Sequence, residues 1–322
     1  MGFDGLAASA PLLLGALLFD AIAGDPQYPF HPIRLIGRTL AALETLLRGI
    51  GLNGYGGGCL LFLLLALICV VPPALFVHYL YGAWPGAGVV AHAVLVYALF
   101  ALRDLIDHTW EIQKACRRED LIGARSAVAR VVGRDTRNMD FAACRRAGIE
   151  SLAENFVDAF VSPLFWYALL GVPGILVFKV VSTMDSMVGY KTATYHRFGW
   201  CGACLDDLMN YVPARLAWLL LGLAATFFPS LSALKGWRIG LEQHSLIPGP
   251  NPGWSEATMA GLLQRRLIGP IFKGGSVVTT VWVGEPQDPE GGKDRDLTLA
   301  IRITVLASLI AGAVGFALLT VG

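Results

Sequence analysis

Long uncharged apolar runs dominate this chain and limit what it can fold into. Crossing a hydrocarbon core about 30 Å thick takes roughly 20 helical residues, and six runs approach that length. They lie at about 5–23, 59–80, 86–102, 159–178, 216–234 and 303–322. Of the 322 residues, 55% are hydrophobic and 15% are charged, against about 25% charged in a typical soluble domain. The sequence therefore predicts an all-α, polytopic integral membrane protein with about five to six membrane segments.

The charged residues indicate which side of the membrane the polar connections face. The 25 Lys and Arg nearly balance the 24 Asp and Glu, so no overall basic field favours a nucleic-acid partner. Ten Lys and Arg lie in the connection 103–158, eight lie in 235–302, and none lies in the link 81–85. Because cytoplasmic loops carry the excess of positive residues, we expect both long connections to be cytoplasmic and both termini to lie outside.

One apolar run has an interruption. The run 159–178 contains Gly171-Val-Pro-Gly174, where proline removes a backbone donor and glycine permits a turn. Such a run is either a bent crossing or a re-entrant hairpin, which is tolerated only where it is buried against protein or water. The sequence leaves the topology of 179–215 open between these two.

Three acidic residues recur at four-residue spacing just before that run. Glu150, Glu154 and Asp158 therefore share one helix face, with Asn155 beside them. Like charges on one strip repel one another unless a cation, such as Arg146 one turn earlier or bound Mg²⁺, holds them together. A functional strip at the membrane edge is the favoured interpretation, and a solvated acidic face is the alternative.

A second acidic group follows the interrupted run. Asp185 lies in a polar stretch, and Asp206 and Asp207 precede Asn210 by one turn. Mg²⁺ is commonly held by one or two carboxylates together with substrate phosphates, and Lys191 or Arg215 would suit a phosphate ligand. The alternative is a polar membrane-surface loop with internal ion pairs.

Two further polar segments contain candidate functional residues. Asp20 lies at the edge of the first run and is followed by His31-Pro-Ile-Arg34, and an acid at that depth is either functional or a helix cap. Pro250-Asn-Pro-Gly-Trp-Ser-Glu256 predicts a rigid turn that brings Ser255 and Glu256 to a helix N-terminus, and the alternative for Ser255 is a plain N-cap. No P-loop motif occurs, so any nucleotide is bound by another scaffold.

Together these polar segments resemble the CobD/CbiB family of membrane-bound cobalamin-biosynthesis proteins, the adenosylcobinamide-phosphate synthases. The matching stretches follow in order over nearly the whole chain: Phe19-Asp20 with Gly24-Asp-Pro26, His31-Pro-Ile-Arg34 with Gly37, Val132-Gly-Arg-Asp-Thr136, Glu150 to Asp158, Ser162-Pro-Leu-Phe165, Thr183 to Lys191, Asp206-Asp207 with Asn210 and Pro213-Ala-Arg215, and Pro250-Asn251 with Trp254-Ser-Glu-Ala257. One departure is Leu267-Ile-Gly-Pro270, where the family often has Leu-Gly-Gly-Pro. This departure falls in the loop that follows the Trp-Ser-Glu helix.

The resemblance implies an ATP-dependent acid–amine ligase. It would join adenosylcobyric acid to aminopropanol phosphate, or to a related amino-alcohol phosphate, through an acyl phosphate. The implied cofactors are ATP and Mg²⁺, and the implied domain is a single membrane-embedded catalytic domain over 1–322. The implied location is the cell inner membrane, as a multi-pass protein with a cytoplasmic active site. Expected partners are the corrinoid, the amino-alcohol phosphate, the lipid bilayer, and either a second copy of the chain or other corrinoid-pathway enzymes.

Residue type and motif position then give the candidate site residues. The catalytic candidates are Glu150, Glu154, Asp158, Asp185 and His31. The candidates for substrate or phosphate binding are Arg34, Arg134, Asn155, Lys191, Asn210, Arg215, Asn251, Ser255 and Glu256. The candidate metal ligands are Asp185, Asp206, Asp207 and Glu154. Two alternatives stay open, namely a non-catalytic membrane sensor of the same superfamily and a small-molecule transporter.

Overall fold

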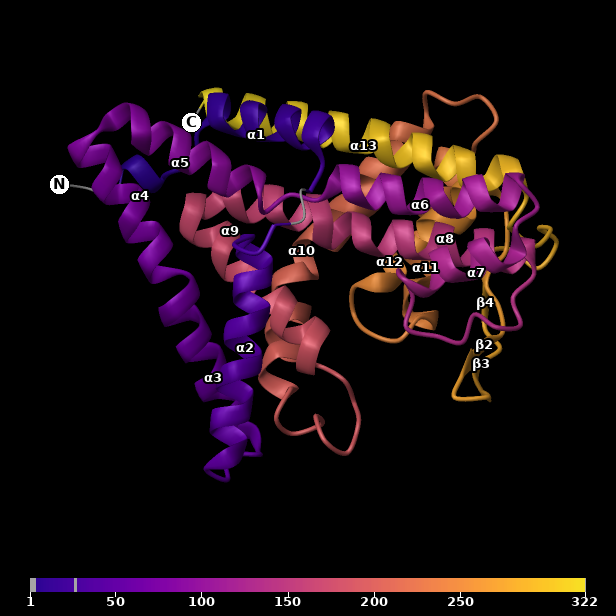
Figure 1. Ribbon diagram of the computed structural model, residues 1–322. Helices are drawn as coiled ribbons and strands as arrows, with labels where there is room; N and C mark the ends of the chain where they lie inside the picture. Colours follow the sequence, from indigo (N-terminus) through magenta and orange to yellow (C-terminus); the bar gives the residue numbers. More distant parts are fainter. Residues whose placement is uncertain (1–3, 26–27, 322) are drawn as a thin grey trace. The chain divides into compact units, whose positions relative to one another are not determined.

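The computed structural model describes residues 4–25 and 28–321, and nearly all of its regular structure is helical (Figure 1). Pro26 and Gly322, which belong to the sequence-based expectations, lie outside the described residues. The helical elements are η1 (Asp4–Leu6), α1 (Ala10–Ala23), α2 (Pro32–Gly49), α3 (Tyr55–Cys69), α4 (Val71–Ala83), α5 (Pro85–Tyr97), α6 (Leu102–Arg117), α7 (Leu121–Ala129), α8 (Phe141–Phe156), η2 (Val157–Val161), α9 (Ser162–Val188), α10 (Trp200–Ala225), α11 (Ala233–Gln243), η3 (His244–Leu246), α12 (Pro252–Leu263) and α13 (Asp294–Val321). Four short strands are β1 (Leu267–Ile268), β2 (Ile271–Lys273), β3 (Ser276–Thr279) and β4 (Trp282–Val283).

Within the described residues, five helical stretches are long and apolar enough to cross a membrane. They are Tyr55–Ala83, Pro85–Arg117, Phe141–Val188, Trp200–Ala225 and Asp294–Val321. The first expected segment folds as α1, an apolar helix of 14 residues that is shorter than a full crossing. The prediction of an all-α, polytopic membrane protein with about five to six segments is confirmed.

The chain forms two compact units. Unit 1 comprises Met1–Ala101, Ser162–Asn210 and Gly312–Gly322. Unit 2 comprises Leu102–Val161 and Tyr211–Ala311. The single catalytic domain expected over 1–322 stays a prediction.

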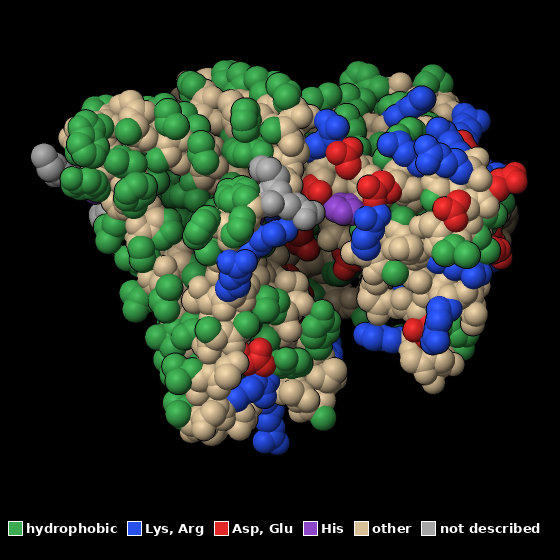
Figure 2. Space-filling model, viewed as in Figure 1, with side chains coloured by type: hydrophobic (Ala, Val, Ile, Leu, Met, Phe, Trp, Pro, Cys, Tyr) green, Lys and Arg blue, Asp and Glu red, His purple; other side chains and the backbone are tan. Residues whose placement is uncertain are grey.

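Unit 1 presents an apolar surface over α3, α4 and α5. Figure 2 shows hydrophobic side chains spread over this part of the molecule. The exposed apolar residues of these helices include Leu63, Leu67, Leu75, Phe76 and Val90. Leaving that much apolar surface in water is unfavourable by about 25 cal/mol per Å². These helices are therefore built to face lipid.

Helix α9 bends back on itself at Gly171. The backbone there has φ of 63° and ψ of −147°, a conformation that glycine adopts readily and other residues do not. A Cβ atom on Gly174 would lie 2.3 Å from the carbonyl oxygen of Trp166. In a continuous helix these residues, eight apart, would be separated by about 12 Å. The two halves of α9 therefore form a hairpin, as the interruption in the sequence allowed.

Unit 2 holds its polar connections in place with helix caps. Asp140 accepts a hydrogen bond from the Ala143 N–H at 2.7 Å and so starts α8. Asp120 does the same for α7 through the Gly123 N–H at 2.8 Å. The turn between α7 and α8, which carries Arg134, therefore ends at the capped start of α8.

Two antiparallel strand pairs complete unit 2. Strand β1 pairs with β4, and β2 pairs with β3. Phe272 of β2 accepts a hydrogen bond from the Asp135 N–H at 2.8 Å, and Asp135 Oδ2 accepts one from the Gly275 N–H at 2.8 Å. These contacts fasten the β2–β3 hairpin to the turn that carries Arg134.

Candidate functional site

A pocket in unit 2 gathers three glutamates and one arginine from separate parts of the chain. Its volume is about 300 Å³. Glu150 and Glu154 reach it from α8, Glu256 from α12, and Arg134 from the turn before α8. We call it the carboxylate pocket. Asp158 lies beyond it, in the π-helical turn η2, so the structure ends the regular α-helical strip after Glu154.

Glu150 and Arg134 form a nearly buried ion pair at this pocket. Arg134 Nη2 lies 2.5 Å from Glu150 Oε2, and the two side chains are 12% and 7% exposed. Glu150 Oε1 accepts a second hydrogen bond from the Ile268 N–H at 2.9 Å. Both carboxylate oxygens are therefore occupied, and Glu150 holds Arg134 and the β1 turn in position.

Arg134 keeps one donor for a ligand. Its Nε is buried, and within the described residues no hydrogen-bond partner reaches it. A buried donor without a partner is unfavourable by about 1–3 kcal/mol. The guanidinium is therefore suited to a bound anion, which would satisfy the remaining N–H.

Glu256 is a carboxyl group set among other carboxylates. It lies in α12, where every residue from Gly253 to Leu263 is buried. Burial, followed by the charges of Glu154 and Glu150, raises the pKa of Glu256 well above its usual range, and Arg134 opposes this shift only in part. Glu256 thus tends to keep its proton, and a neutral carboxyl can donate a hydrogen bond that a carboxylate cannot.

A larger, basic pocket adjoins the carboxylate pocket within unit 2. Its volume is about 660 Å³, and Arg134 and Ile268 line both pockets. Its other basic side chains are Arg137 and Arg146. Guanidinium groups bind phosphate oxygens in pairs of parallel hydrogen bonds, so this arginine pocket has the chemistry of a phosphate site.

Arg146 is held at the rim of the arginine pocket by three contacts, one of which is an ion pair with Glu290 Oε2 at 3.7 Å. Arg146 Nη1 donates to the Gly291 carbonyl at 3.2 Å, and its guanidinium lies 5.1 Å from the centre of the Trp282 ring. Arg137 and Arg146 were absent from the candidates taken from the sequence. The run Val132-Gly-Arg-Asp-Thr136 is followed at once by Arg137, and that continuation was the signal available.

The wall shared by the two pockets contains a strained residue. Ile268 has φ of 69°, a left-handed conformation that is unfavourable for a β-branched side chain by roughly 1–2 kcal/mol. This is the position where the family often has glycine, so the sequence departure falls on the backbone that needs glycine's freedom. The strained conformation directs the Ile268 N–H at Glu150.

An aromatic cluster lies at the start of α12. Trp254 stacks on His244 with ring centres 4.1 Å apart, and the Arg215 guanidinium lies 4.7 Å from the Trp254 ring centre.

Asn251 occupies the N-cap position of α12. The alternative of Ser255 as an N-cap is wrong, because Ser255 lies inside the helix and its hydroxyl donates to the Pro252 carbonyl at 3.2 Å. Asn155 likewise bonds locally, to the Ser151 carbonyl at 2.8 Å.

Unit 1 gathers the second acidic group. Asp185 of α9 and Asp207 of α10 interact electrostatically, and Lys191 interacts with Asp207. Asp206 Oδ2 accepts a hydrogen bond from Asn210 Nδ2 at 3.0 Å. The structure therefore brings together the acids, the lysine and the amide that the sequence separates by up to 25 positions.

The N-terminal candidates also belong to unit 1. His31 is buried at the start of α2, with Nε2 2.8 Å from Asp25 Oδ1, whereas Arg34 is exposed one turn later. Helix α2 packs on α9, since a Cβ atom on Gly37 would lie 3.5 Å from Met187 Sδ. Asp20 is buried in α1.

The candidate metal ligands do not form a ready-made cage. Within residues 4–25 and 28–321, no three His, Cys, Asp or Glu side chains converge as metal ligands. Glu154 belongs to unit 2, and Asp185, Asp206 and Asp207 belong to unit 1. Mg²⁺ often binds through one or two carboxylates plus substrate phosphates, so exposed Glu154 beside the arginine pocket fits that mode.

Comparison with known proteins identifies the family. The family model described as CobD/Cbib protein matches residues 13–304. The chain belongs to the CobD/CbiB family. It is 38% identical to a cobalamin biosynthesis protein CobD of Sinorhizobium sp, over 85% of this chain and 87% of that protein. It is 37% identical to CobD of Pelobacter propionicus, over 94% of each chain.

A relative with the other family name matches equally well. The chain is 36% identical to the cobalamin biosynthesis protein CbiB of Salmonella typhi, over 92% of this chain and 93% of that protein. No solved structure matches the chain. The CobD/CbiB resemblance found in the motifs is therefore confirmed, and its named members are cobalamin biosynthesis proteins.

Proposed function

We propose that this CobD/CbiB chain is an ATP-dependent acid–amine ligase of cobalamin biosynthesis. It would join the carboxylate of adenosylcobyric acid to the amine of aminopropanol phosphate, or of a related amino-alcohol phosphate. The observation that carries the proposal is the pairing of the carboxylate pocket with the arginine pocket, which share Arg134. The chemistry requires phosphate binding and proton transfer side by side, and these two pockets supply both.

In the first step the substrate carboxylate attacks the terminal phosphorus of ATP. An acyl phosphate forms, the bond to the bridging oxygen breaks, and ADP leaves. Arg134, Arg137 and Arg146 would hold the phosphate oxygens, which neutralises charge as it shifts to the leaving group. Mg²⁺, held by Glu154 together with the phosphates, would supply further charge neutralisation.

In the second step the amine attacks the acyl carbon and inorganic phosphate leaves. The attacking nitrogen must lose a proton, and an ionised carboxylate can accept it. Glu154 is the exposed carboxylate of the pocket, and the oxygen that does not bind Mg²⁺ would accept this proton. Buried Glu256 tends to stay protonated and suits donation to the departing phosphate. Asp185, Asp207 and Lys191 of unit 1 form a second polar group that we assign to substrate binding.

The test is a ligation assay on the protein purified in detergent. It would be incubated with Mg²⁺-ATP, adenosylcobyric acid and aminopropanol phosphate, and the corrinoid followed by mass. We expect a product heavier by the amine minus water, formed only with ATP. Glu154→Gln should abolish most turnover, whereas the exposed Glu242→Gln, which changes the same side chain outside both pockets, should not.

A folded protein that forms no product would overturn the proposal, once threonine phosphate and ethanolamine phosphate have also been tried. Uptake of labelled corrinoid into liposomes would then favour the transporter alternative. Binding of the corrinoid without turnover or uptake would favour the sensor.

We also propose that both pockets face the cytoplasm, because unit 2 contains the whole of the basic connections 103–158 and 235–302. The turn at Gly274–Gly275, between β2 and β3, is exposed and accommodates a protease site. Cleavage in inside-out vesicles and protection in right-side-out vesicles is expected. The opposite pattern would reverse the orientation.

A further inference from the structure

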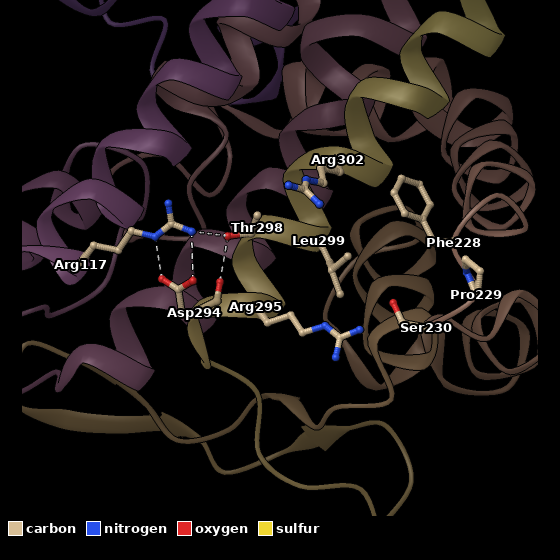
Figure 3. Close-up of a pocket in the computed structure, with 9 residues that line it drawn as sticks. All are labelled: Arg117, Phe228, Pro229, Ser230, Asp294, Arg295, Thr298, Leu299 and Arg302. Atoms are coloured by element: carbon tan, nitrogen blue, oxygen red, sulfur yellow. Dashed lines mark hydrogen bonds and ion pairs between the residues drawn. The ribbon is translucent and has the colours of Figure 1, made fainter.

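A separate pocket of unit 2 lies against the first turns of α13. Its volume is about 330 Å³, and Figure 3 shows its lining. The lining residues are Arg117, Phe228, Pro229, Ser230, Asp294, Arg295, Thr298, Leu299 and Arg302. None of them lines the carboxylate pocket or the arginine pocket.

One of the three arginines in this pocket is already neutralised. Arg117 forms two parallel bonds with the Asp294 carboxylate, Nε to Oδ1 at 2.8 Å and Nη2 to Oδ2 at 3.0 Å. Arg117 Nη2 also donates to Thr298 Oγ1 at 3.1 Å. This paired group forms one fixed wall of the pocket and adds little net charge.

The other two arginines are not neutralised by the protein. In the described part of the chain, neither Arg295 nor Arg302 has a hydrogen-bond or ion-pair partner, and both are exposed. They are seven residues apart, nearly two helical turns, so they lie on the same side of α13. Figure 3 shows Arg295 extending toward Ser230 and Arg302 lying across from Phe228. The pocket therefore has two unpaired positive charges beside an aromatic wall.

The sequence sets this pocket at the edge of the membrane. Arg302 is the last charged residue of α13, and residues 303–321 carry no charge. Phe228 follows the end of α10, another helix long enough to cross a membrane. Beyond Arg302, the exposed side chains of Val305 and Leu309 continue along the same side of the helix. The positive charges of α13 therefore end where lipid headgroups would lie, and the apolar side chains beyond them are placed to contact acyl chains.

We propose that this pocket binds the phosphate headgroup of an anionic phospholipid. Arg295 and Arg302 would contact the phosphate oxygens, Ser230 would donate a hydrogen bond, and the acyl chains would lie along Val305 and Leu309. Basic pockets beside membrane helices are suited to anionic headgroups because the charge is held where the lipid phosphate lies. A lipid, unlike a soluble phosphate, also buries the apolar surface that continues beyond Arg302.

The test is calorimetric titration of the detergent-purified full chain with short-chain phosphatidylglycerol, and with short-chain phosphatidylcholine as the uncharged counterpart. We expect phosphatidylglycerol to bind and phosphatidylcholine to bind much more weakly. The double variant R295Q/R302Q should weaken phosphatidylglycerol binding about 30-fold, because each basic residue contributes about 1 kcal/mol near an anionic surface. R295K/R302K, which keeps both charges, should retain most of the affinity.

The matched control is R118Q/K273Q, which removes two exposed positive charges outside this pocket. Its affinity for phosphatidylglycerol should equal that of the unmodified chain. If the control weakened phosphatidylglycerol binding as much as R295Q/R302Q does, the effect would be one of general surface charge, and the proposal would be overturned. Equally tight binding of inorganic phosphate or glycerol phosphate would overturn the lipid assignment in favour of a soluble anion, and no binding of phosphatidylglycerol would overturn the site.

Discussion

Arg134 and Glu150 form an ion pair in which Nη2 lies 2.5 Å from Oε2, with both side chains almost entirely removed from solvent. The pair joins the turn before α8 to α8 itself, and the Ile268 N–H ties β1 to the same carboxylate. A turn, the helix that follows it and a strand 118 residues further along the chain therefore converge on one carboxylate group.

Breaking this pair on one side should destabilise the protein strongly. Arg134→Met leaves Glu150 buried without its main counter-charge, and we expect the unfolding free energy to fall by about 3–5 kcal/mol. Replacing both residues, as in R134M/E150L, should cost less than the sum of the two single changes. Denaturation in detergent, followed by circular dichroism, checks this with a double-mutant cycle, and strictly additive losses would contradict it.

Glu256 should make stability depend on pH. Because the pKa of Glu256 is raised in the folded protein, its carboxyl group ionises at a lower pH in the unfolded chain than in the folded one. Its stabilising contribution is therefore complete below the usual glutamate pKa and is lost as pH rises toward the folded value, by up to about 1.4 kcal/mol per pH unit.

Glu256→Gln cannot ionise, so its melting temperature should exceed that of the unmodified chain by more as the pH rises through this window. Exposed Glu242→Gln is the control and should show no such trend. A melting-temperature difference between E256Q and the unmodified chain that stays constant with pH would show that Glu256 titrates normally.

A glycine contact in unit 1 gives a test of packing. A Cβ atom on Gly58 would lie 2.0 Å from the Phe198 carbonyl oxygen, whereas one on Gly56 would meet nothing within 4 Å. Both residues belong to α3, where alanine is intrinsically better than glycine by about 1 kcal/mol. Gly56→Ala should therefore be neutral or stabilising, and Gly58→Ala should lower the melting temperature. Similar melting temperatures for the two variants would mean that α3 does not approach Phe198 so closely.

Arg137 provides a test of phosphate binding that leaves the fold intact. It is exposed, so Arg137→Gln should change the unfolding free energy by no more than about 0.5 kcal/mol. Losing one charge-assisted hydrogen bond to phosphate should raise the KM for ATP about tenfold, with a smaller effect on kcat. Lys273→Gln, an exposed charge on the neighbouring hairpin, should leave both constants unchanged. A normal KM for R137Q would remove Arg137 from the phosphate site.

The helices and the membrane segments could be predicted well from the sequence, because the length of an apolar run can be read from neighbouring residues alone. It also predicted that Glu150 and Glu154 share a helix face, which depends only on local periodicity. The short strands β1 to β4 were not predicted, since two to four residues show no alternating pattern. The strained turn at Ile268 was anticipated only as a departure from the family motif.

The burial of Glu256 could not be predicted from periodicity. Helix α12 is buried on all sides, so it has no polar face for the sequence to reveal. Likewise, Arg137 and Arg146 join Arg134 only because α8, the preceding turn and the strands pack together. Burial raises the pKa of Glu256 most, and the charges of Glu154 and Glu150 in α8, which lies about 100 residues earlier, raise it further.

The reversal at Gly171 changes how the path of this polypeptide through a bilayer must be counted. Ahead of the turn, the apolar residues 159–170 extend about 18 Å as a helix, well short of the roughly 30 Å hydrocarbon thickness. A hydropathy profile registers one peak here, but a chain that enters and returns does not change sides. A sidedness map that counts this peak as one crossing and one that counts it as a re-entrant hairpin will therefore place a reporter fused just after Val188 on opposite sides of the membrane.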